Sequence, residues 1–250
     1  MKAPYSPVTS SLTLVGVGPG DPSLLTLAAV KAIQDSTVVS FPITKEGEES
    51  LAAQIAGDWI TEDKKRLPLI FPMVSEASPR KEAWKKAGHQ LAIAVSTGEK
   101  VVFLCQGDVS LFSTSAYLLL ELKANHPDCP LKLIPGVNSF SAAAAKGHWP
   151  LTLQQDQLLV MPAPENLETL ERVLEDAALK GRVVVLLKVG KRWGWIRTLL
   201  ERKNILDSSL FAQRVGFSDE RVISCNDVLE EEAHYFSLVL IRQEWPKVIP

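Results

Sequence analysis

Short hydrophobic runs alternate with amphipathic stretches along the first part of the chain. The runs are almost continuously apolar, as is typical of strands buried on both faces of a sheet. Alternation with helical stretches is typical of an α/β domain with a mainly parallel sheet. The pattern predicts strands over 12–17, 37–41, 67–71, 100–105 and 131–134, and helices starting at Pro22 behind an Asp21 cap and over 49–60, 80–96, 114–123 and 139–146.

A break in the pattern divides the chain. Gly147 to Pro150, followed by polar residues, predict a linker between an N-terminal domain, 1–150, and a C-terminal domain, 151–250. Because no long helix separates its last strands, the second domain is predicted to contain a mixed sheet, so that the fold class is two-domain α/β. This half is predicted to have strands over 158–162, 182–189, 209–215, 221–224 and 235–241, and helices over 165–178 and 193–202.

Composition narrows the functional classes. The 250 residues carry a net charge of −2, with 27 basic and 29 acidic residues mixed along the chain, which argues against nucleic-acid and membrane partners. No segment has the ~20 apolar residues of a membrane span or an apolar leader. The three cysteines form no CxxC pair, which favours free thiols in the cytoplasm. The four histidines form no HxH or HExxH motif, so we expect no metal site.

A glycine-rich turn, GVGPGD at 16–21, joins the first predicted strand to the first helix. Glycines there permit positive φ and close approach of a ligand, although a tight strand–helix turn would need them too. The spacing is not the GxGxxG of a dinucleotide site, and no acid follows the second strand. Pro19 also lacks the N–H that a phosphate cradle uses. A pyrophosphate site, and with it an NAD-dependent dehydrogenase, is therefore disfavoured.

Two further glycine turns follow later strands. Asp108 lies in CQGDVSLFSTSAY, where it can bind a ligand or cap a turn or helix. Asn138 and Ser139 lie in IPGVNSFSAAAA, where they can equally cap the helix. Because the carboxyl ends of parallel strands meet at one edge of a sheet, the three turns are predicted to line one side of a crevice.

These motifs resemble those of the tetrapyrrole methylase family. GVGPGDPSLLTLAAVKAI, QGDVSLFSTSAY and IPGVNSFSAAAA are similar to its three motifs in order and spacing, and VVVLLKVGKRW resembles a strand of its second domain. GDVSLFST, FPM, KVGKRW and YFSL are most similar to the precorrin-2 C(20)-methyltransferases of that family. The resemblance implies a homodimeric enzyme that transfers a methyl group from S-adenosylmethionine to C-20 of precorrin-2 or cobalt-precorrin-2, with its active site in the cleft between two domains.

The resemblance also implies which residues contact S-adenosylmethionine, the methyl donor. In the first motif the contacts are Gly18 and Pro19, and in the second Gln106, Gly107, Asp108 and Leu111. The remaining predicted contacts are Asn138 and Ser139 in the third motif, and Leu187, Lys188 and Val215 in the second domain.

The tetrapyrrole substrate is a polycarboxylate, which basic side chains bind well. Lys191 and Arg192, next to Lys188, form the densest basic cluster and are the predicted substrate contacts, although a solvated loop would show the same pattern. No residue stands out as a proton acceptor. Two alternatives stay open: another tetrapyrrole methylase, such as one acting on uroporphyrinogen III, and a non-catalytic tetrapyrrole-binding protein.

Overall fold

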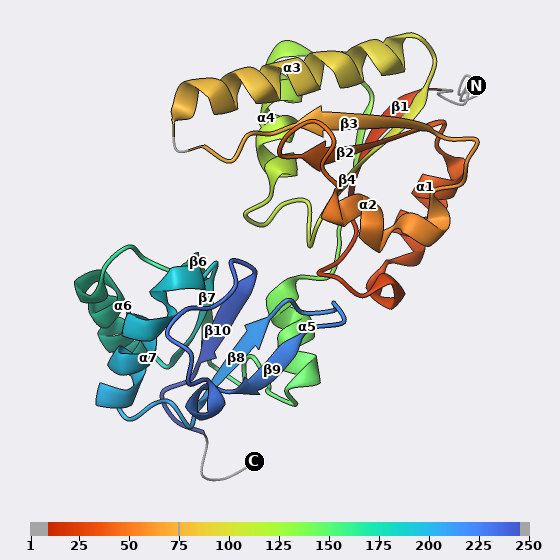
Figure 1. The fold of residues 1–250 in the computed structure, drawn as a ribbon. Helices are drawn as coiled ribbons and strands as arrows, with labels where there is room; N and C mark the ends of the chain where they lie inside the picture. The colour runs from red at the N-terminus through yellow and green to blue at the C-terminus, as the bar shows by residue number, and fades with distance from the viewer. Residues whose placement is uncertain (1–9, 75, 246–250) are drawn as a thin grey trace, which may run out of the picture. The chain divides into compact units, whose positions relative to one another are not determined.

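The computed structural model describes residues 10–74 and 76–245 (Figure 1). The chain forms two compact units, 1–138 and 139–250. Each unit is built around its own five-stranded sheet. The predicted α/β class, with one parallel and one mixed sheet, is confirmed.

The sheet of the first unit is entirely parallel. Its strand order is β3-β2-β4-β1-β5, so the chain passes over the sheet between successive strands. The strands β1, β2 and β4 lie inside the sheet and are almost wholly buried, whereas the edge strands β3 and β5 are largely exposed. The strands are β1 (Ser11–Gly16), β2 (Val38–Ile43), β3 (Lys65–Ile70), β4 (Lys100–Cys105) and β5 (Leu131–Ile134).

Helices cover both faces of this sheet (Figure 1). Leu91 of α3 and Leu118 of α4 pack with Leu14 and Phe103 in one buried cluster. The opposite face carries the helices α1 and α2, which contact β1, β2 and β4. Two layers of helices thus shield strands that are apolar on both faces. The helices are α1 (Leu27–Asp35), α2 (Leu51–Ile55), α3 (Ala77–Ser96) and α4 (Thr114–Asn125).

The helix predicted to begin at Pro22 is divided in two. Asp21 does cap a turn, but this turn is a short 3-10 helix, Pro22–Leu24, and Leu25 returns to extended backbone. The α-helix begins only after Thr26, whose hydroxyl accepts a hydrogen bond from the Ala29 N–H at 3.1 Å. Thr26 is therefore a second N-cap, which the apolar periodicity concealed. The predicted helix over 49–60 is likewise divided into α2 and a 3-10 turn, Gly57–Trp59.

The second unit contains a mixed sheet of order β6-β7-β10-β8-β9. Only β6 and β7 pair in parallel, while β10 pairs antiparallel with both β7 and β8. The helices α6 and α7 bury their apolar sides against this sheet, with Trp193 and Phe211 at the centre of the core. The elements are α5 (Ser139–Lys146), β6 (Gln157–Pro162), α6 (Leu167–Lys180), β7 (Arg182–Leu187), α7 (Trp193–Arg202), β8 (Ser209–Gln213), β9 (Arg221–Ser224) and β10 (Ser237–Ile241).

The segment predicted as a linker, 147–150, is packed inside the second unit. A Cβ atom on Gly147 would lie 2.4 Å from Leu210 Cδ2. The buried Trp149 ring packs edge to face against the Trp245 ring, with the ring centroids 5.2 Å apart. The guanidinium of Arg242 lies over both rings and pairs with Asp156 at 2.7 Å. The division between the compact units falls at Asn138 rather than at residue 150, because α5 packs on β10.

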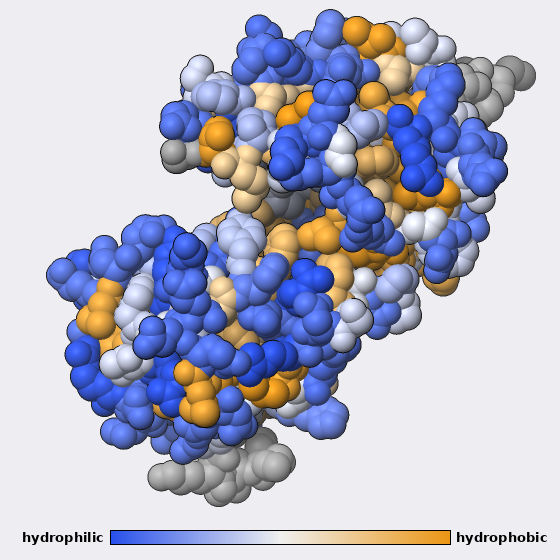
Figure 2. All heavy atoms as spheres, viewed as in Figure 1, coloured by the Kyte–Doolittle hydropathy of each residue, from blue (hydrophilic) through white to orange (hydrophobic). Residues whose placement is uncertain are grey.

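Hydrophilic residues cover most of the face drawn in Figure 2, and hydrophobic residues appear there in separate small patches. Among the residues that the structure describes, no helix is long and apolar enough to cross a membrane.

Candidate functional site

Three glycine turns meet at the carboxyl edge of the first sheet. The strands β4, β1 and β5 are neighbours and all parallel, so the turns that follow them lie together. A Cβ atom on Gly136 would lie 2.1 Å from the Gly107 carbonyl oxygen, and one on Gly16 would lie 2.6 Å from the same atom. The three backbones are therefore in direct contact, which only glycine permits. The predicted convergence of the turns is confirmed.

The first two turns are joined by hydrogen bonds. The Gly18 N–H donates to the Gly107 carbonyl oxygen at 3.2 Å, and the Gly107 N–H donates to the Gly18 carbonyl oxygen at 2.7 Å. Both glycines have positive φ, 80° and 73°. The Gln106 side-chain amide donates to the Pro19 carbonyl oxygen at 2.9 Å. The two turns thus form one surface, which is made mainly of backbone and joined by hydrogen bonds.

Asp108 joins the third turn to the second. One carboxylate oxygen accepts from the Gly136 N–H at 3.0 Å, and the other accepts from the N–H and hydroxyl of Ser110 at 2.9 and 2.5 Å. Burial alone would raise the pKa of Asp108, but the hydrogen bonds from Ser110, Gly136 and Val109 outweigh it and hold this pKa below its usual value. These contacts show that the Asp108 carboxylate fixes the second and third turns to each other.

The position that a side chain would take at Gly107 is open. No atom lies within 4 Å of the place that a Cβ atom would take there. Cys105, just before this turn, is buried, and burial raises the pKa of its thiol to about 11 even though the Ser115 hydroxyl donates to the sulfur at 3.2 Å. The thiol is therefore uncharged at neutral pH, and the backbone and the Asp108 carboxylate supply the polarity of this edge.

The predicted contacts in the second unit also share one edge. Because β7 and β8 both run opposite to β10, their carboxyl ends lie beside its first residue, Ser237. Leu187 ends β7, and Lys188 follows with a φ of 57°; Arg214, after β8, has a φ of 49°. Val215 is buried. Left-handed backbone at non-glycine residues occurs in the turns after both strands, as is frequent near functional sites.

The two predicted substrate contacts have different surroundings. The guanidinium of Arg192 forms an ion pair with Glu165 and donates to the Lys188 carbonyl oxygen at 3.2 Å. Lys191 is exposed. Arg192 is thus already engaged within the second unit, which the basic pattern of the sequence did not indicate.

The structure therefore brings the predicted residues together in two groups, one in each unit. Gly18, Pro19, Gln106, Gly107 and Asp108 form the first, with Leu111 later in the same turn. Asn138 and Ser139 stand on either side of the division between the units. The second group is formed by Leu187, Lys188, Lys191, Arg192 and Val215.

Sequence reasoning missed Gly16 and Gly136 as the residues that set the spacing of the turns. It also missed Ser110 as a hydrogen-bond partner of Asp108. The available signal was its position two residues after an Asp, where the backbone N–H often donates to the Asp side chain.

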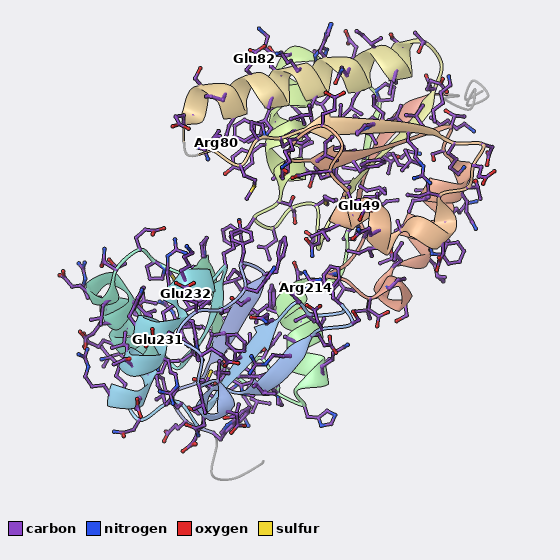
Figure 3. All side chains as sticks on the ribbon, in the orientation of Figure 1. Glu49, Arg80, Glu82, Arg214, Glu231 and Glu232 are labelled. Carbon is purple, nitrogen blue, oxygen red and sulfur yellow. The ribbon has the colours of Figure 1, made fainter. Side chains whose placement is uncertain are left out.

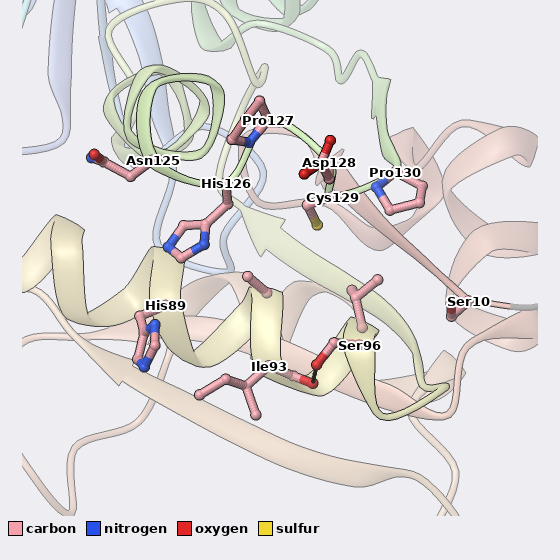
Figure 4. Close-up of a pocket in the computed structure, with 12 residues that line it drawn as sticks. Ser10, His89, Ile93, Ser96, Asn125, His126, Pro127, Asp128, Cys129 and Pro130 are labelled. Carbon is pink, nitrogen blue, oxygen red and sulfur yellow. Dashed lines mark hydrogen bonds between the residues drawn. The ribbon is translucent and has the colours of Figure 1, made fainter.

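A cavity of about 460 Å³ lies elsewhere in the first unit, between α3 and the segment before β5 (Figure 4). Ser10, Ser96 and Pro130 line it, and each stands near the start of a strand. The cavity is therefore at the amino edge of the sheet, opposite the glycine turns. His89 and His126 face each other there, with ring centroids 5.7 Å apart.

Within 10–74 and 76–245, no three His, Cys, Asp or Glu residues are grouped so as to hold a metal ion.

Residues 11–227 match the family described as Tetrapyrrole (Corrin/Porphyrin) Methylases. The chain belongs to this family, which comprises methyltransferases that use S-adenosylmethionine. The resemblance seen in the motifs is thereby confirmed.

Two relatives of the chain have named activities within this family. The chain is 28% identical to the cobalt-precorrin-2 C(20)-methyltransferase of Salmonella typhimurium, over 95% of this chain and 98% of the relative. It is 29% identical to the precorrin-2 C(20)-methyltransferase of a Sinorhizobium species, over 91% and 93% of the two chains.

Solved structures share the fold. The methyltransferase CobJ superposes with a TM-score of 0.67 at 21% identity, covering 93% of this chain and 94% of that one. The uroporphyrin-III C-methyltransferase of Thermus thermophilus, complexed with S-adenosylhomocysteine, superposes with a TM-score of 0.61 at 22% identity, covering 93% and 92%.

Proposed function

We propose that this protein transfers the methyl group of S-adenosylmethionine to C-20 of precorrin-2 or cobalt-precorrin-2, a step of cobalamin biosynthesis. The observation that carries the proposal is the agreement over more than 90% of both chains with two relatives of that activity. The joined glycine turns in the first unit supply a surface suited to the methyl donor.

The donor fits this surface for physical reasons. An adenosyl group and a methionine tail carry no phosphate, so Pro19, which lacks an N–H, is no obstacle. The open space at Gly107 lets a ligand approach the backbone closely. Gly18, Pro19, Gln106, Gly107, Asp108 and Leu111 are the proposed donor contacts of the first unit, with Asn138, Ser139, Leu187, Lys188 and Val215 completing the set.

The chemistry asks the protein mainly for positioning. The electron-rich C-20 carbon attacks the methyl carbon in line with the departing sulfur, a C–C bond forms, the C–S bond breaks, and the uncharged thioether S-adenosylhomocysteine leaves. C-20 then loses its proton to the surrounding water, and the ring system becomes neutral again. A rigid donor surface favours this reaction because it holds the two reacting atoms in near-attack geometry.

The deciding experiment incubates the protein with S-adenosylmethionine labelled on its methyl group and, separately, with precorrin-2, cobalt-precorrin-2 and uroporphyrinogen III. Label incorporated into precorrin-2 or its cobalt form, and located at C-20 by NMR, is the expected result. Label only in uroporphyrinogen III would replace the proposed substrate by that of the alternative methylase. Tetrapyrrole binding without label transfer would favour the non-catalytic alternative.

Assembly as a homodimer and a cytoplasmic location stay predictions. Sedimentation at micromolar concentration tests the first, and twice the 27.4 kDa mass of the chain is expected. A monomeric mass would contradict it.

A further inference from the structure

The loop that leads into β10 stands at the edge where the second unit gathers its predicted contacts. Ser237 lies opposite Gln213 of β8, and its carbonyl oxygen accepts from the Val189 N–H at 3.1 Å, just after β7. The Phe236 carbonyl oxygen accepts from the Arg214 N–H at 2.8 Å. Residues 234–236 therefore lie between the carboxyl ends of β7 and β8.

His234 in this loop is exposed but held in one orientation. Its backbone N–H donates to Gln213 Oε1 at 2.9 Å, and its ring stacks on the Phe236 ring with centroids 5.6 Å apart. The Phe236 N–H donates to His234 Nδ1 at 3.0 Å. A backbone N–H can only donate, so Nδ1 must accept, and the neutral imidazole carries its proton on Nε2. An exposed N–H donor is thus fixed at this edge.

Two aromatic rings lie beside this donor. Tyr235 and Phe236 meet edge to face with centroids 5.2 Å apart, and they are 45% and 38% exposed. Arg214, labelled in Figure 3, pairs with Asp219 at 2.7 Å and lies over the Phe217 ring. The edge combines apolar ring surface with an oriented donor, which suits a flat macrocycle that carries carboxylates on its rim.

We propose that His234 donates a hydrogen bond from Nε2 to a peripheral carboxylate of the tetrapyrrole, while Tyr235 and Phe236 pack against the macrocycle. This inference rests on the proposed function and adds a substrate contact to it. His234 acts as a binding residue and not as the base that removes the C-20 proton, because Nδ1 is occupied by the Phe236 N–H and Nε2 already carries the proton of the neutral ring. The exposed surface of the Tyr235 and Phe236 rings favours a large apolar macrocycle over a small anion.

Two substitutions separate the two ring nitrogens. His234→Asn keeps an acceptor near Nδ1 for the Phe236 N–H but removes the outward donor. His234→Gln places an amide donor near Nε2. We expect His234→Asn to raise the Michaelis constant for precorrin-2 about tenfold or more, as loss of a hydrogen bond to a charged group would. The turnover number and the affinity for S-adenosylmethionine should not change, and His234→Gln should restore part of the loss.

His148→Asn is the matched control. His148 is another exposed histidine of the second unit, and its φ of 50° is one that asparagine tolerates. Its substitution should leave the Michaelis constant unchanged.

The outcomes distinguish this inference from the proposed function. If the wild-type protein methylates precorrin-2 and His234→Asn does so with an unchanged Michaelis constant, the inference is overturned while the function stands. His234 would then only tie the loop. If the wild-type protein neither methylates nor binds any tetrapyrrole, judged by absorbance titration, both are overturned. If it methylates a different tetrapyrrole, the proposed substrate is wrong, and the same variants measured on that compound decide the role of His234.

Discussion

The predicted site residues lie at one sheet edge in each unit, and the two edges present different kinds of groups. In the first unit, backbone groups of three glycine turns pack against each other, and both carboxylate oxygens of Asp108 accept hydrogen bonds that join the second turn to the third. In the second unit, the corresponding edge presents side chains: Lys191, the Arg192–Glu165 pair and the aromatic loop before β10. A backbone surface can serve one ligand in a whole family, whereas a side-chain surface can differ with each substrate. Under the proposed function, most donor contacts come from the first edge, and the side chains of the second edge set the tetrapyrrole specificity.

Among substitutions in the first edge, Gly136→Ala is expected to have the largest effect on stability and donor binding. The new methyl group would lie 2.1 Å from the Gly107 carbonyl oxygen, which belongs to the backbone and not to a flexible side chain that could turn away. We expect a loss of about 3 kcal/mol of unfolding free energy, together with loss of S-adenosylmethionine binding. Chemical denaturation and calorimetry measure the two effects.

Gly57→Ala is the control for this substitution. Gly57 has no atom within 4 Å of the added Cβ and does not have positive φ, so stability and donor affinity should stay close to the wild type. A Gly136→Ala protein as stable as Gly57→Ala would contradict the close packing of the turns.

Gly18→Val tests the conformation of the same edge rather than its packing. A Cβ atom fits there, with its nearest neighbour, the Leu24 carbonyl oxygen, at 3.6 Å, but a β-branched residue resists the φ of 80°. The strain of about 1–3 kcal/mol should lower donor affinity at least about fivefold in a folded protein. Gly98→Val, at a φ of 95° beyond α3, measures the backbone cost alone. Equal donor affinity in the Gly18 and Gly98 variants would show that the first turn does not hold the donor.

Asp108→Asn tests what joins the second and third turns. Asparagine keeps one acceptor oxygen but replaces the other, so a hydrogen bond from Gly136 or Ser110 is lost, at a cost of about 1–3 kcal/mol. The pKa of Asp108 is lowered in the folded state, so its carboxylate stabilises the fold above the unfolded pKa of about 3.9. This contribution disappears as pH falls through the lower folded pKa. The difference in unfolding free energy between wild type and variant should therefore be full at pH 7 and shrink below about pH 4. A difference that does not depend on pH would exclude the charge of Asp108 as its cause.

The same contrast explains what the sequence could and could not reveal. The parallel sheet and the convergence of the turns were predictable from the sequence. Apolar runs mark buried strands, and glycine and proline mark positions where the backbone conformation is special. Thr26 as a second helix cap and the packing of Trp149 under Arg242 were not, because each depends on a competing local hydrogen bond or a distant partner. The tie from Asp108 to Gly136 joins positions 28 apart. The orientation of His234 was equally hidden, because its partner Gln213 lies in β8, 21 positions earlier in the chain.

The smallest expected effect concerns the second edge and the ion pair that already occupies Arg192. Glu165 is 81% exposed at its side chain, and exposed pairs contribute about 0–1 kcal/mol, so Glu165→Gln should barely change stability. If Arg192 binds a substrate carboxylate, Glu165 competes with the substrate for the guanidinium. Its removal should then lower the Michaelis constant for the tetrapyrrole a few-fold, and the gain should shrink in added salt because the charges are partly exposed. Affinity for S-adenosylmethionine should stay constant, since neither Glu165 nor Arg192 is among the proposed donor contacts. A raised Michaelis constant would mean instead that Glu165 holds Arg192 in its working position, and an unchanged one would leave Lys191 as the only basic substrate contact of this pair.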